Sequence, residues 1–136
     1  MNPALARSRT WPLKATNRSR NKFGAQPTML DGIRFASKAE ADCFARLKLR
    51  EKAKEIMHLQ AHPKWQFMVN GQVGPTYSAD MSFYDVVRGT TRVVDVKSPS
   101  TAKLEAFKIK RWLMFALYGI YVEIWPSGRE PTRAAA

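Results

Sequence analysis

Two aspartates and a lysine are the residues of this sequence whose spacing is best suited to chemistry. Asp95 and Lys97 stand two residues apart in an apolar segment typical of a β-strand, and Asp80 lies in the alternating segment before it. Side chains two residues apart in a strand point to the same face, about 6 to 7 Å from each other. Two neighbouring carboxylates oppose each other's ionisation unless a cation lies between them. The two carboxylates can bind one cation together only if Asp80 lies on the same face of the sheet as Asp95.

Carboxylates that share a face are the oxygen ligands that Mg²⁺ and Mn²⁺ prefer. Such an ion stabilises the charge on a phosphate under attack and lowers the pKa of a bound water. An ammonium beside it, here that of Lys97, can orient the water and offset the developing negative charge. The residues therefore predict metal-dependent hydrolysis of phosphodiester bonds. The alternative is an ordinary solvated sheet face on which Asp80 and Lys97 form a salt bridge, and the pattern alone favours neither.

The register of a predicted hairpin decides which side chains meet. Residues 77–85 alternate between apolar and polar, residues 88–89 (Arg-Gly) suit a turn, and residues 92–97 form the next strand. We predict the register in which the numbers of opposite partners sum to 177. It pairs Phe83 with Val94, Met81 with Val96, Asp85 with Arg92, and Asp80 with Lys97. Because a slip of one residue would set apolar against polar side chains, the apolar pattern favours a register that clusters Asp80, Asp95 and Lys97.

A helix is predicted from Ser37 to about Met57. Ser37 and Glu40 have the spacing of a capping box, in which the serine accepts from the first-turn amides and the glutamate reaches back. One stripe of this helix carries Glu40, Cys43, Phe44 and Leu47, and it should face the sheet.

Glu40 has two interpretations. It can serve helix geometry alone, as the glutamate of the capping box. Because it lies on the stripe that turns inward, its carboxylate also needs a partner, which a metal ion would supply. We favour the second role, and the two are compatible.

The remaining elements complete an α/β fold. A strand at residues 65–69 ends at Asn70 and Gly71, which suit a hairpin turn, and the strands at 77–85 and 92–97 follow. A second helix covers roughly residues 101–118, with Ile109, Leu113, Ala116 and Leu117 on one stripe. Gly119 ends it, and residues 120–125 form a last strand. The order helix, three strands, helix, strand predicts a mixed central sheet flanked by helices.

The charge indicates an anionic partner. The 136 residues include 23 Lys and Arg against 11 Asp and Glu, a net charge of +12, and nucleic acid is the usual partner of so basic a domain. A solubility surface or a lipid-binding patch are the alternatives. We predict a flexible basic arm at residues 1–30, one folded domain at 31–126 and a disordered tail at 127–136. The predicted nucleic-acid contacts are Arg18, Arg20, Lys22, Lys38, Lys103, Lys108, Lys110 and Arg111.

Other classes of site receive little support. Cys43 is the single cysteine, which excludes an internal disulfide and a cysteine-based zinc site and suits a reducing cytoplasm. The longest apolar run, residues 112–125, contains Glu123 and is too short to cross a bilayer. His58 and His62 have the spacing of a helical zinc pair, but Pro63 follows directly and no further ligand completes the set.

Several short motifs resemble those of a known nuclease superfamily in their order and spacing. They are residues 21–25 (NKFGA), 31–41 (DGIRFASKAEA), 77–80 (YSAD), 94–97 (VDVK), 108–113 (KIKRWL) and 118–120 (YGI). A helix with SKAEA, followed by an aspartate and then by D-x-K, resembles the PD-(D/E)XK nucleases. More narrowly the chain is similar to the small phage-associated group filed as domain of unknown function 1064.

This resemblance implies a restriction-endonuclease-like fold and a nuclease of the Holliday-junction-resolvase type over residues 31–126. It implies that Glu40, Asp80, Asp95 and the carbonyl of Val96 bind Mg²⁺ or Mn²⁺, and that Lys97 positions the attacking water. Ala79 replaces the proline of the motif, and Asp95 stands where glutamate is more frequent.

The resemblance further implies branched or junction DNA as substrate, a homodimer and no small-molecule cofactor. The location is then the cytoplasm, that of the host if the chain is phage-encoded. For Trp112, Phe115 and Tyr118 we favour core or subunit contacts over base stacking. The rival hypotheses are a non-catalytic nucleic-acid-binding protein on the same fold, a basic phage assembly protein, and a nuclease that acts on RNA.

Overall fold

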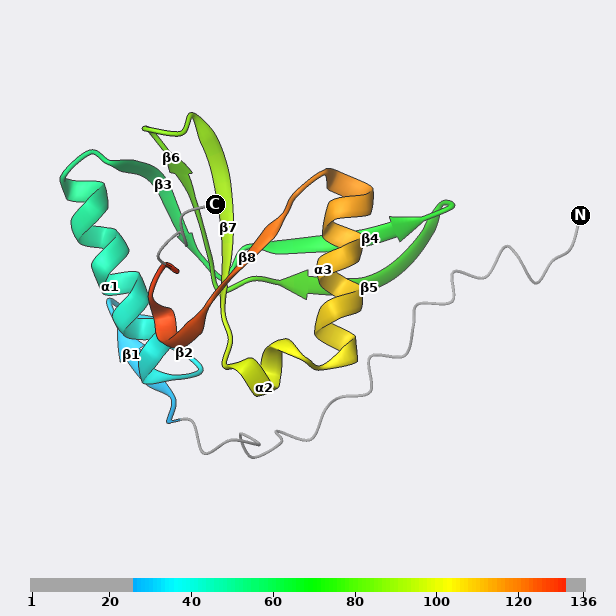
Figure 1. Cartoon of the computed structure of the whole chain (residues 1–136), viewed down its shortest axis with the longest axis horizontal. Coiled ribbons are helices and arrows are strands. Elements are labelled where there is room, and N and C mark those ends of the chain that lie inside the picture. Colours follow the sequence, from blue (N-terminus) through cyan, green and yellow to red (C-terminus); the bar gives the residue numbers. More distant parts are fainter. Residues whose placement is uncertain (1–25, 132–136) are drawn as a thin grey trace, which may run out of the picture.

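The computed structural model describes residues 26–131, and a four-stranded sheet lies at its centre (Figure 1). The strand order is β3-β6-β7-β8; β6 is antiparallel to both β3 and β7, and β8 is parallel to β7. Helix α1 covers one face, and helix α3 and the β4–β5 hairpin cover the other. The predicted mixed α/β class is therefore confirmed. The elements are β1 (Thr28–Leu30), β2 (Ile33–Phe35), α1 (Lys38–Lys52), β3 (Ile56–Ala61), β4 (Lys64–Val69), β5 (Gln72–Ser78), β6 (Met81–Asp85), β7 (Thr90–Val96), α2 (Pro99–Ala102), α3 (Glu105–Tyr118), β8 (Val122–Trp125) and the 3₁₀ turn η2 (Pro126–Gly128).

Two apolar clusters, one on each face of the central sheet, form the core. The cluster under α1 contains Phe35, Cys43, Phe44, Leu47, Ile56, Met81, Phe83, Val94 and Trp125. The cluster under α3 contains Phe67, Tyr77, Ala79, Val93, Phe107, Met114 and Val122. Because successive side chains of a strand alternate between faces, Val93 and Val94 belong to different clusters. The same alternation directs Asp95 toward α3.

The first helix begins where predicted and ends earlier. Ser37 caps it by accepting from the Glu40 amide at 3.2 Å, as the capping-box motif indicated. The helix stops at Lys52 instead of about Met57, and Lys54 takes a left-handed φ of +62°. Residues 56–61 instead pair with β6 as β3. This pairing is a long-range contact, and the local periodicity carried no trace of it.

The zinc pair considered for His58 and His62 does not form. His58 lies exposed in β3, at a register irregularity between Met57 and Gln60, and His62 follows the strand. Both histidines have positive φ, so neither belongs to a helix that would put them on one face. The helical spacing was misleading because the helix had already ended.

The register of the β6–β7 hairpin differs from the prediction by two residues. Met81 lies opposite Val94, and Phe83 lies opposite Arg92, so opposite partners sum to 175. Asp85 sets the longer turn: its carboxylate accepts from the Arg88 amide at 3.0 Å and its carbonyl from the Gly89 amide at 2.8 Å. A shift of two preserves the faces within the paired segments 81–85 and 90–94, so Met81, Phe83 and Val94 share one face as predicted. The predicted Asp85–Arg92 ion pair also forms, at 3.0 Å.

The segment predicted as one strand from 77 to 85 is divided between two sheets. Its first residues end β5, which begins at Gln72 and pairs with β4 across the predicted turn, where Asn70 and Gly71 both have positive φ. The chain leaves this hairpin at Ala79 and Asp80 and enters the central sheet as β6. The break therefore falls at the predicted site residue Asp80.

Both ends of the described chain are more ordered than predicted. Residues 28–30, assigned to the flexible arm, form β1 and pair with β2; residues 1–25 lie outside the described residues. The disordered tail predicted from residue 127 is wrong for its first part. Gly128 is buried against α1, and Glu130 pairs with Arg92 at 2.6 Å. Long-range contacts hold this segment, although its composition resembles a tail.

Gly128 gives a sharp test of that packing. A Cβ at Gly128 would lie 2.6 Å from the Ala39 carbonyl oxygen, and its φ is +78°. We expect Gly128→Ala to lower the free energy of unfolding by more than about 1 kcal/mol. The matched control is Gly32→Ala, where φ is +75° but no atom lies within 4 Å of the added carbon. Equal losses in urea unfolding would show that only backbone strain matters and that η2 does not pack on α1.

The second predicted helix is two helices, and its buried stripe differs from the prediction. The short α2 ends at Lys103, and α3 begins at Glu105 and stops at Gly119, whose φ of +68° makes the left-handed cap. Phe107 and Met114 are buried, whereas Ile109 and Leu117 of the predicted stripe are exposed. Helix α3 is apolar on nearly every side, so periodicity could not choose the face. Among residues 26–131, the longest helices are too short or too polar to cross a bilayer.

Candidate active site

Asp95 lies near the end of β7, an inner strand of the central sheet, and is 1% exposed. One oxygen of its carboxylate accepts from the Asp80 amide at 3.0 Å, and the other accepts from the Tyr77 hydroxyl of β5. Burial, and then the charge of Asp95, raise the pKa of Tyr77, which keeps this hydroxyl a donor. The β4–β5 hairpin therefore fixes the orientation of the carboxylate.

Asp80 lies at the junction between the two sheets. Its amide donates to the Val94 carbonyl at 3.2 Å, and its carboxylate accepts from the Val96 amide at 2.6 Å. The Asp80 carboxylate thus accepts a hydrogen bond from β7 that a backbone carbonyl would accept in a regular β-ladder. Asp80 precedes the first ladder pair, Met81 with Val94, and its amide contacts the Asp95 carboxylate at 3.0 Å, whereas we predicted it opposite Lys97. The two carboxylates are closer partners than the sequence indicated.

The surroundings of the Asp80 carboxylate supply too little positive charge to keep it ionised at neutral pH. Burial raises the pKa of Asp80 to about 8, with further increases from the charges of Asp95 and Glu40. The Val96 amide and Lys97 lower it by less. At neutral pH this group holds a proton unless a cation replaces it.

Lys97 lies at the end of β7, on the same face as Asp95. Its ammonium nitrogen stands 5.2 Å from the ring centre of Phe107 on α3, and its charge lowers the pKa of both Asp80 and Glu40. The strand alternation that predicted this placement is confirmed, while the contact with the aromatic ring required the tertiary fold.

Glu40 is half-buried at the start of α1, where Ser37 caps the helix as predicted, but the glutamate reaches the Ala36 amide instead of the Ser37 amide. Its carboxylate accepts from the Ala36 amide at 3.2 Å, and its own amide donates to Ser37. Burial raises the pKa of Glu40 above its ordinary value. The hydrogen bond from Ala36 and the charges of His62 and Lys97 oppose this shift, and the charge of Asp95 adds to it. Glu40 is therefore influenced by the charges of Asp95 and Lys97, while its carboxylate is already engaged by the Ala36 amide.

Tyr77 and His62 are the neighbours that sequence reasoning missed. The amide of His62 donates to the Asp80 carbonyl at 2.9 Å. Its ring packs at a tilt against Phe35, and its Nε2 lies 2.9 Å from the Arg34 carbonyl oxygen. Alternation over residues 77–85 placed Tyr77 on the face of Met81, away from Asp80, whereas the break at residues 79–80 turns it toward Asp95. His62 and Asp80 lie far apart in the sequence, and no local pattern predicted their contact.

The donor set fits a hard divalent cation in kind. Mg²⁺ commonly uses one or two carboxylates and completes its shell with waters and phosphate oxygens. Asp80 and Asp95 supply such a pair, and their mutual repulsion gives it an affinity for positive charge. Among residues 26–131, no three His, Cys, Asp or Glu side chains lie close enough to enclose a metal by themselves. The four-ligand set with Glu40 and Val96 is therefore not preassembled.

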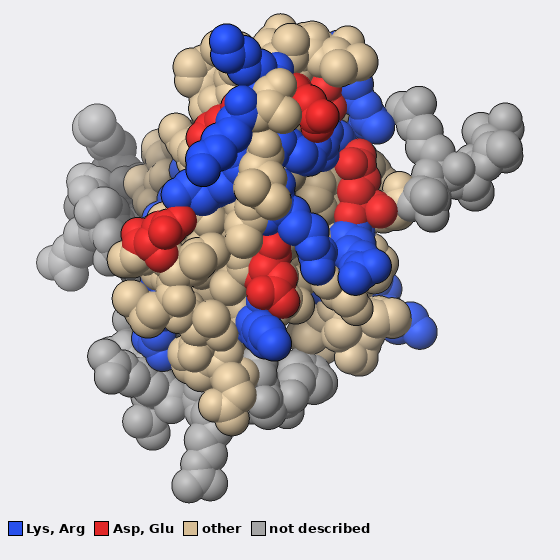
Figure 2. Space-filling model, turned by 90° about the vertical axis from the view of Figure 1, so that its left-hand side faces the viewer, with Lys and Arg blue, Asp and Glu red and all other residues tan. Residues whose placement is uncertain are grey.

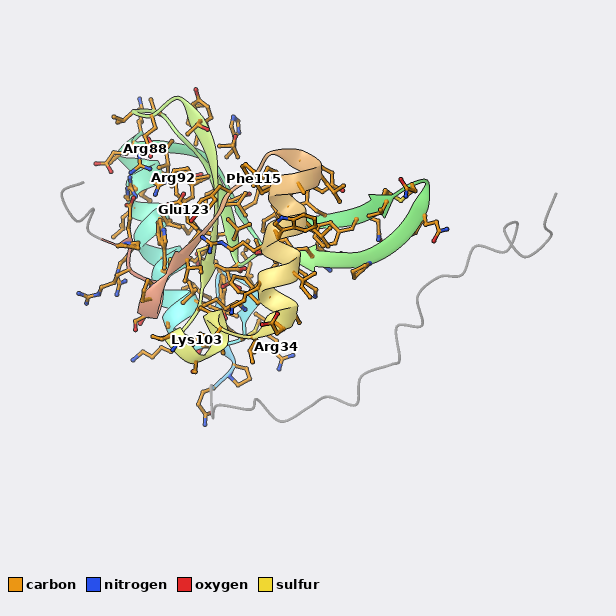
Figure 3. All side chains as sticks on the ribbon, turned by 45° about the vertical axis from the view of Figure 1, so that its right-hand side comes forward. Arg34, Arg88, Arg92, Lys103, Phe115 and Glu123 are labelled. Carbon is orange, nitrogen blue, oxygen red and sulfur yellow. The ribbon has the colours of Figure 1, made fainter. Side chains whose placement is uncertain are left out.

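The predicted nucleic-acid contacts divide between two regions. Lys103, Lys108, Lys110 and Arg111 lie on α2 and α3, Lys38 lies exposed at the start of α1, and Arg18, Arg20 and Lys22 lie outside the described residues. Figure 3 shows Lys103 and Arg34 toward the end of the molecule where β7 leads into α2, the end that carries Lys97. Arg88, Arg92 and Glu123 gather at the opposite end.

The face over α1 has charges of both signs, as Figure 2 shows. Lys48 pairs there with Asp31 at 2.6 Å, and Arg50 with Glu55 at 3.1 Å. On α3, by contrast, Glu105 is the single acid of the helix, against Lys108, Lys110 and Arg111. The surface over α3 is therefore the more favourable one for a polyanion.

Residues 20–125 match the model of a family described as "Protein of unknown function (DUF1064)". No curated protein matches the chain, and no solved structure does. The match spans the central sheet, both long helices and the cluster of Asp80, Asp95 and Lys97.

Proposed function

Since this chain belongs to the DUF1064 family, whose function is not assigned, we propose that it is a Mg²⁺- or Mn²⁺-dependent endonuclease that hydrolyses DNA. The observation that carries the proposal is the contact of Asp80 with the Asp95 carboxylate, beside Lys97. Burial, and then the charges of Asp95 and Glu40, raise the pKa of Asp80 to about 8. A helix, three antiparallel strands, a helix and a parallel strand support a restriction-endonuclease-like fold. The β4–β5 hairpin is then an insertion between the first two core strands.

Asp80 and Asp95 would hold the metal, which when bound stabilises phosphate charge and lowers the pKa of a water. Asp80 is partly exposed and Asp95 enclosed, so the cation has access from the side of Asp80. Each carboxylate oxygen has two lone pairs, so the hydrogen bonds from Tyr77 and Val96 leave acceptor capacity for an ion. Glu40 and the carbonyl of Val96 are proposed as further ligands.

Lys97 is proposed to orient the attacking water and to offset the charge that develops on the phosphate. The Phe107 ring under its ammonium restricts its position and excludes water from one side. Tyr77 holds Asp95 in one orientation and is a positioning residue. Preorganised groups of this kind act without further rearrangement during the reaction.

The basic residues of α2 and α3 are proposed to bind the DNA backbone near this cluster. Lys103, Lys108, Lys110 and Arg111 offer such contacts, and the net charge of +12 would attract DNA from solution. Branched DNA as substrate, a homodimer and a cytoplasmic location remain proposals that rest on the resemblance to junction resolvases.

The test is cleavage by the full chain of labelled linear, single-stranded, flapped and four-way DNA, with Mg²⁺, Mn²⁺ or EDTA. We expect cleavage only with metal, and Lys97→Ala to reduce it about 10²- to 10⁴-fold while DNA binding survives. The matched control is Lys52→Ala, which removes an exposed ammonium at the far end of α1. Equal cleavage by the Lys97 variant and the wild-type protein would overturn the proposal.

The second candidate is a non-catalytic nucleic-acid-binding protein on the same fold. The enclosure of Asp95, with both oxygens already hydrogen-bonded, favours it, because a purely structural carboxylate would be held in the same way. On this hypothesis EDTA has no effect, and Asp80→Asn changes neither DNA binding nor any activity of the protein.

A further inference from the structure

The outward side of α3 presents large aromatic side chains to solvent. Trp112 is 65% exposed, Phe115 58% and the neighbouring Tyr121 66%. The inward side of the same helix carries the buried Phe107 and Met114, so the exposed aromatics are not needed to hold the helix on the sheet. This finding contradicts a core role for Trp112 and Phe115. Contiguous exposed apolar groups of this size usually mark an interaction surface.

These aromatics line a cavity of about 370 Å³ together with two cations. The lining residues are Lys108, Arg111, Trp112, Phe115 and Tyr121, without a carboxylate. The Arg111 guanidinium is fixed, because it donates to the Val122 carbonyl at 2.8 Å and stands 4.6 Å from the ring centre of Tyr121. Lys108 has only a loose contact with Glu105, at 3.8 Å between largely exposed groups. Its charge is therefore free to meet an anion.

We propose that this aromatic groove, formed by Lys108, Arg111, Trp112, Phe115 and Tyr121, binds single-stranded nucleic acid. Unpaired bases stack on aromatic rings, and their phosphates are attracted to cations placed between the rings. Duplex DNA cannot use the groove in this way, because its bases are already stacked on one another. The proposal does not depend on cleavage, since Asp80, Asp95 and Lys97 do not line the groove.

The competing occupant is a second copy of the chain, which charge disfavours. A two-fold contact through α3 would bring Lys108 and Arg111 of each copy toward those of the other, and the groove supplies no carboxylate to pair with them. A polyanion removes this repulsion, and the net charge of +12 adds to its attraction. The combination of apolar rings with unpaired positive charge therefore fits nucleic acid better than a copy of the same surface.

The test is fluorescence anisotropy with a labelled 20-nucleotide oligothymidine in EDTA, using the full chain. We expect Trp112→Ala to weaken binding about 5- to 100-fold without changing its dependence on salt, because a ring is lost but no charge. Lys108→Ala should instead reduce the slope of log affinity against log salt by about 0.7. The control is Val87→Ala, an exposed apolar residue in the β6–β7 turn, which should bind as wild type.

Unchanged affinity in Trp112→Ala, with an unchanged melting temperature, would overturn the proposal. A protein that is dimeric by sedimentation, becomes monomeric in Trp112→Ala and still binds oligothymidine as before would assign the groove to a second copy instead. Phe115→Ala provides an independent aromatic variant, with the same expected loss. Because metal is absent throughout, these results are separate from those of the cleavage assay.

Discussion

Asp80→Asn is expected to abolish metal-dependent cleavage and at the same time to stabilise the metal-free protein at pH 8. The pKa of Asp80 is raised to about 8 by burial and by the charges of Asp95 and Glu40. An asparagine keeps an acceptor for the Val96 amide but has no charge to bury. The variant therefore loses an ion ligand and gains stability from the same change.

The sign of the pH effect follows from proton linkage. The unfolded chain loses the proton of Asp80 near pH 3.8, whereas the folded protein keeps it up to about pH 8. Between these values the folded state binds more protons, so wild-type stability falls as pH rises, by at most about 1.4 kcal/mol per pH unit. The Asn variant lacks this loss. The difference in unfolding free energy between the Asn variant and the wild type should therefore grow from pH 4 to 8 and then level off.

The measurement is thermal unfolding of both proteins in EDTA from pH 5 to 9, with Asp42→Asn as control for an exposed carboxylate of α1. Mn²⁺ should stabilise the wild type more at pH 8 than at pH 6, because it must displace the proton of Asp80. It should leave the Asn variant unchanged. Identical pH profiles for wild type and Asp80→Asn would show that Asp80 ionises normally and that the cluster has no special affinity for a cation.

Arg92→Leu is expected to cost about 3 to 5 kcal/mol of unfolding free energy, the largest stability loss at any charged position we consider. Arg92 is 4% exposed and donates to Asp85 at 3.0 Å, to Glu123 at 2.6 and 2.8 Å, and to Glu130 at 2.6 Å. Its guanidinium also stands over the neighbouring rings of Phe83 and Trp125, 5.3 and 5.7 Å from their centres. A leucine would leave the buried Asp85 without its main partner.

Urea unfolding of Arg92→Leu and Arg50→Leu measures this effect. Arg50 pairs with Glu55 and Glu130 but is a third exposed, so its replacement should cost less than about 1 kcal/mol. Arg92→Lys should lie between the two, because an ammonium cannot reproduce the planar fork that joins three carboxylates. If Arg92→Leu lost no more than Arg50→Leu, the network would be solvated and Glu130 would not hold the C-terminal segment in place.

Sequence periodicity was reliable where one face of an element is apolar and the other polar. It assigned Cys43, Phe44 and Leu47 to the buried side of α1, and it placed Asp95 and Lys97 on one face of β7. The shift in register moved the pairing of β6 with β7 by two residues without changing the faces of Met81, Phe83 and Val94. The break before β6, by contrast, turned Tyr77 and Ala79 to the other face. Periodicity failed for α3, because a helix that is apolar on most sides does not indicate which side is covered.

The sequence by itself determined which groups can do chemistry, because alternation along β7 and the capping motif of α1 are local properties. Only the tertiary structure decided how those groups meet. The extra turn residues set by Asp85, the β3 strand that replaced the end of a helix, and the hairpin that carries Tyr77 to Asp95 all depend on contacts between distant segments. Their free energy comes from burial and pairing that no short stretch of chain contains, so the positions of Tyr77, His62 and Glu130 had to come from the fold.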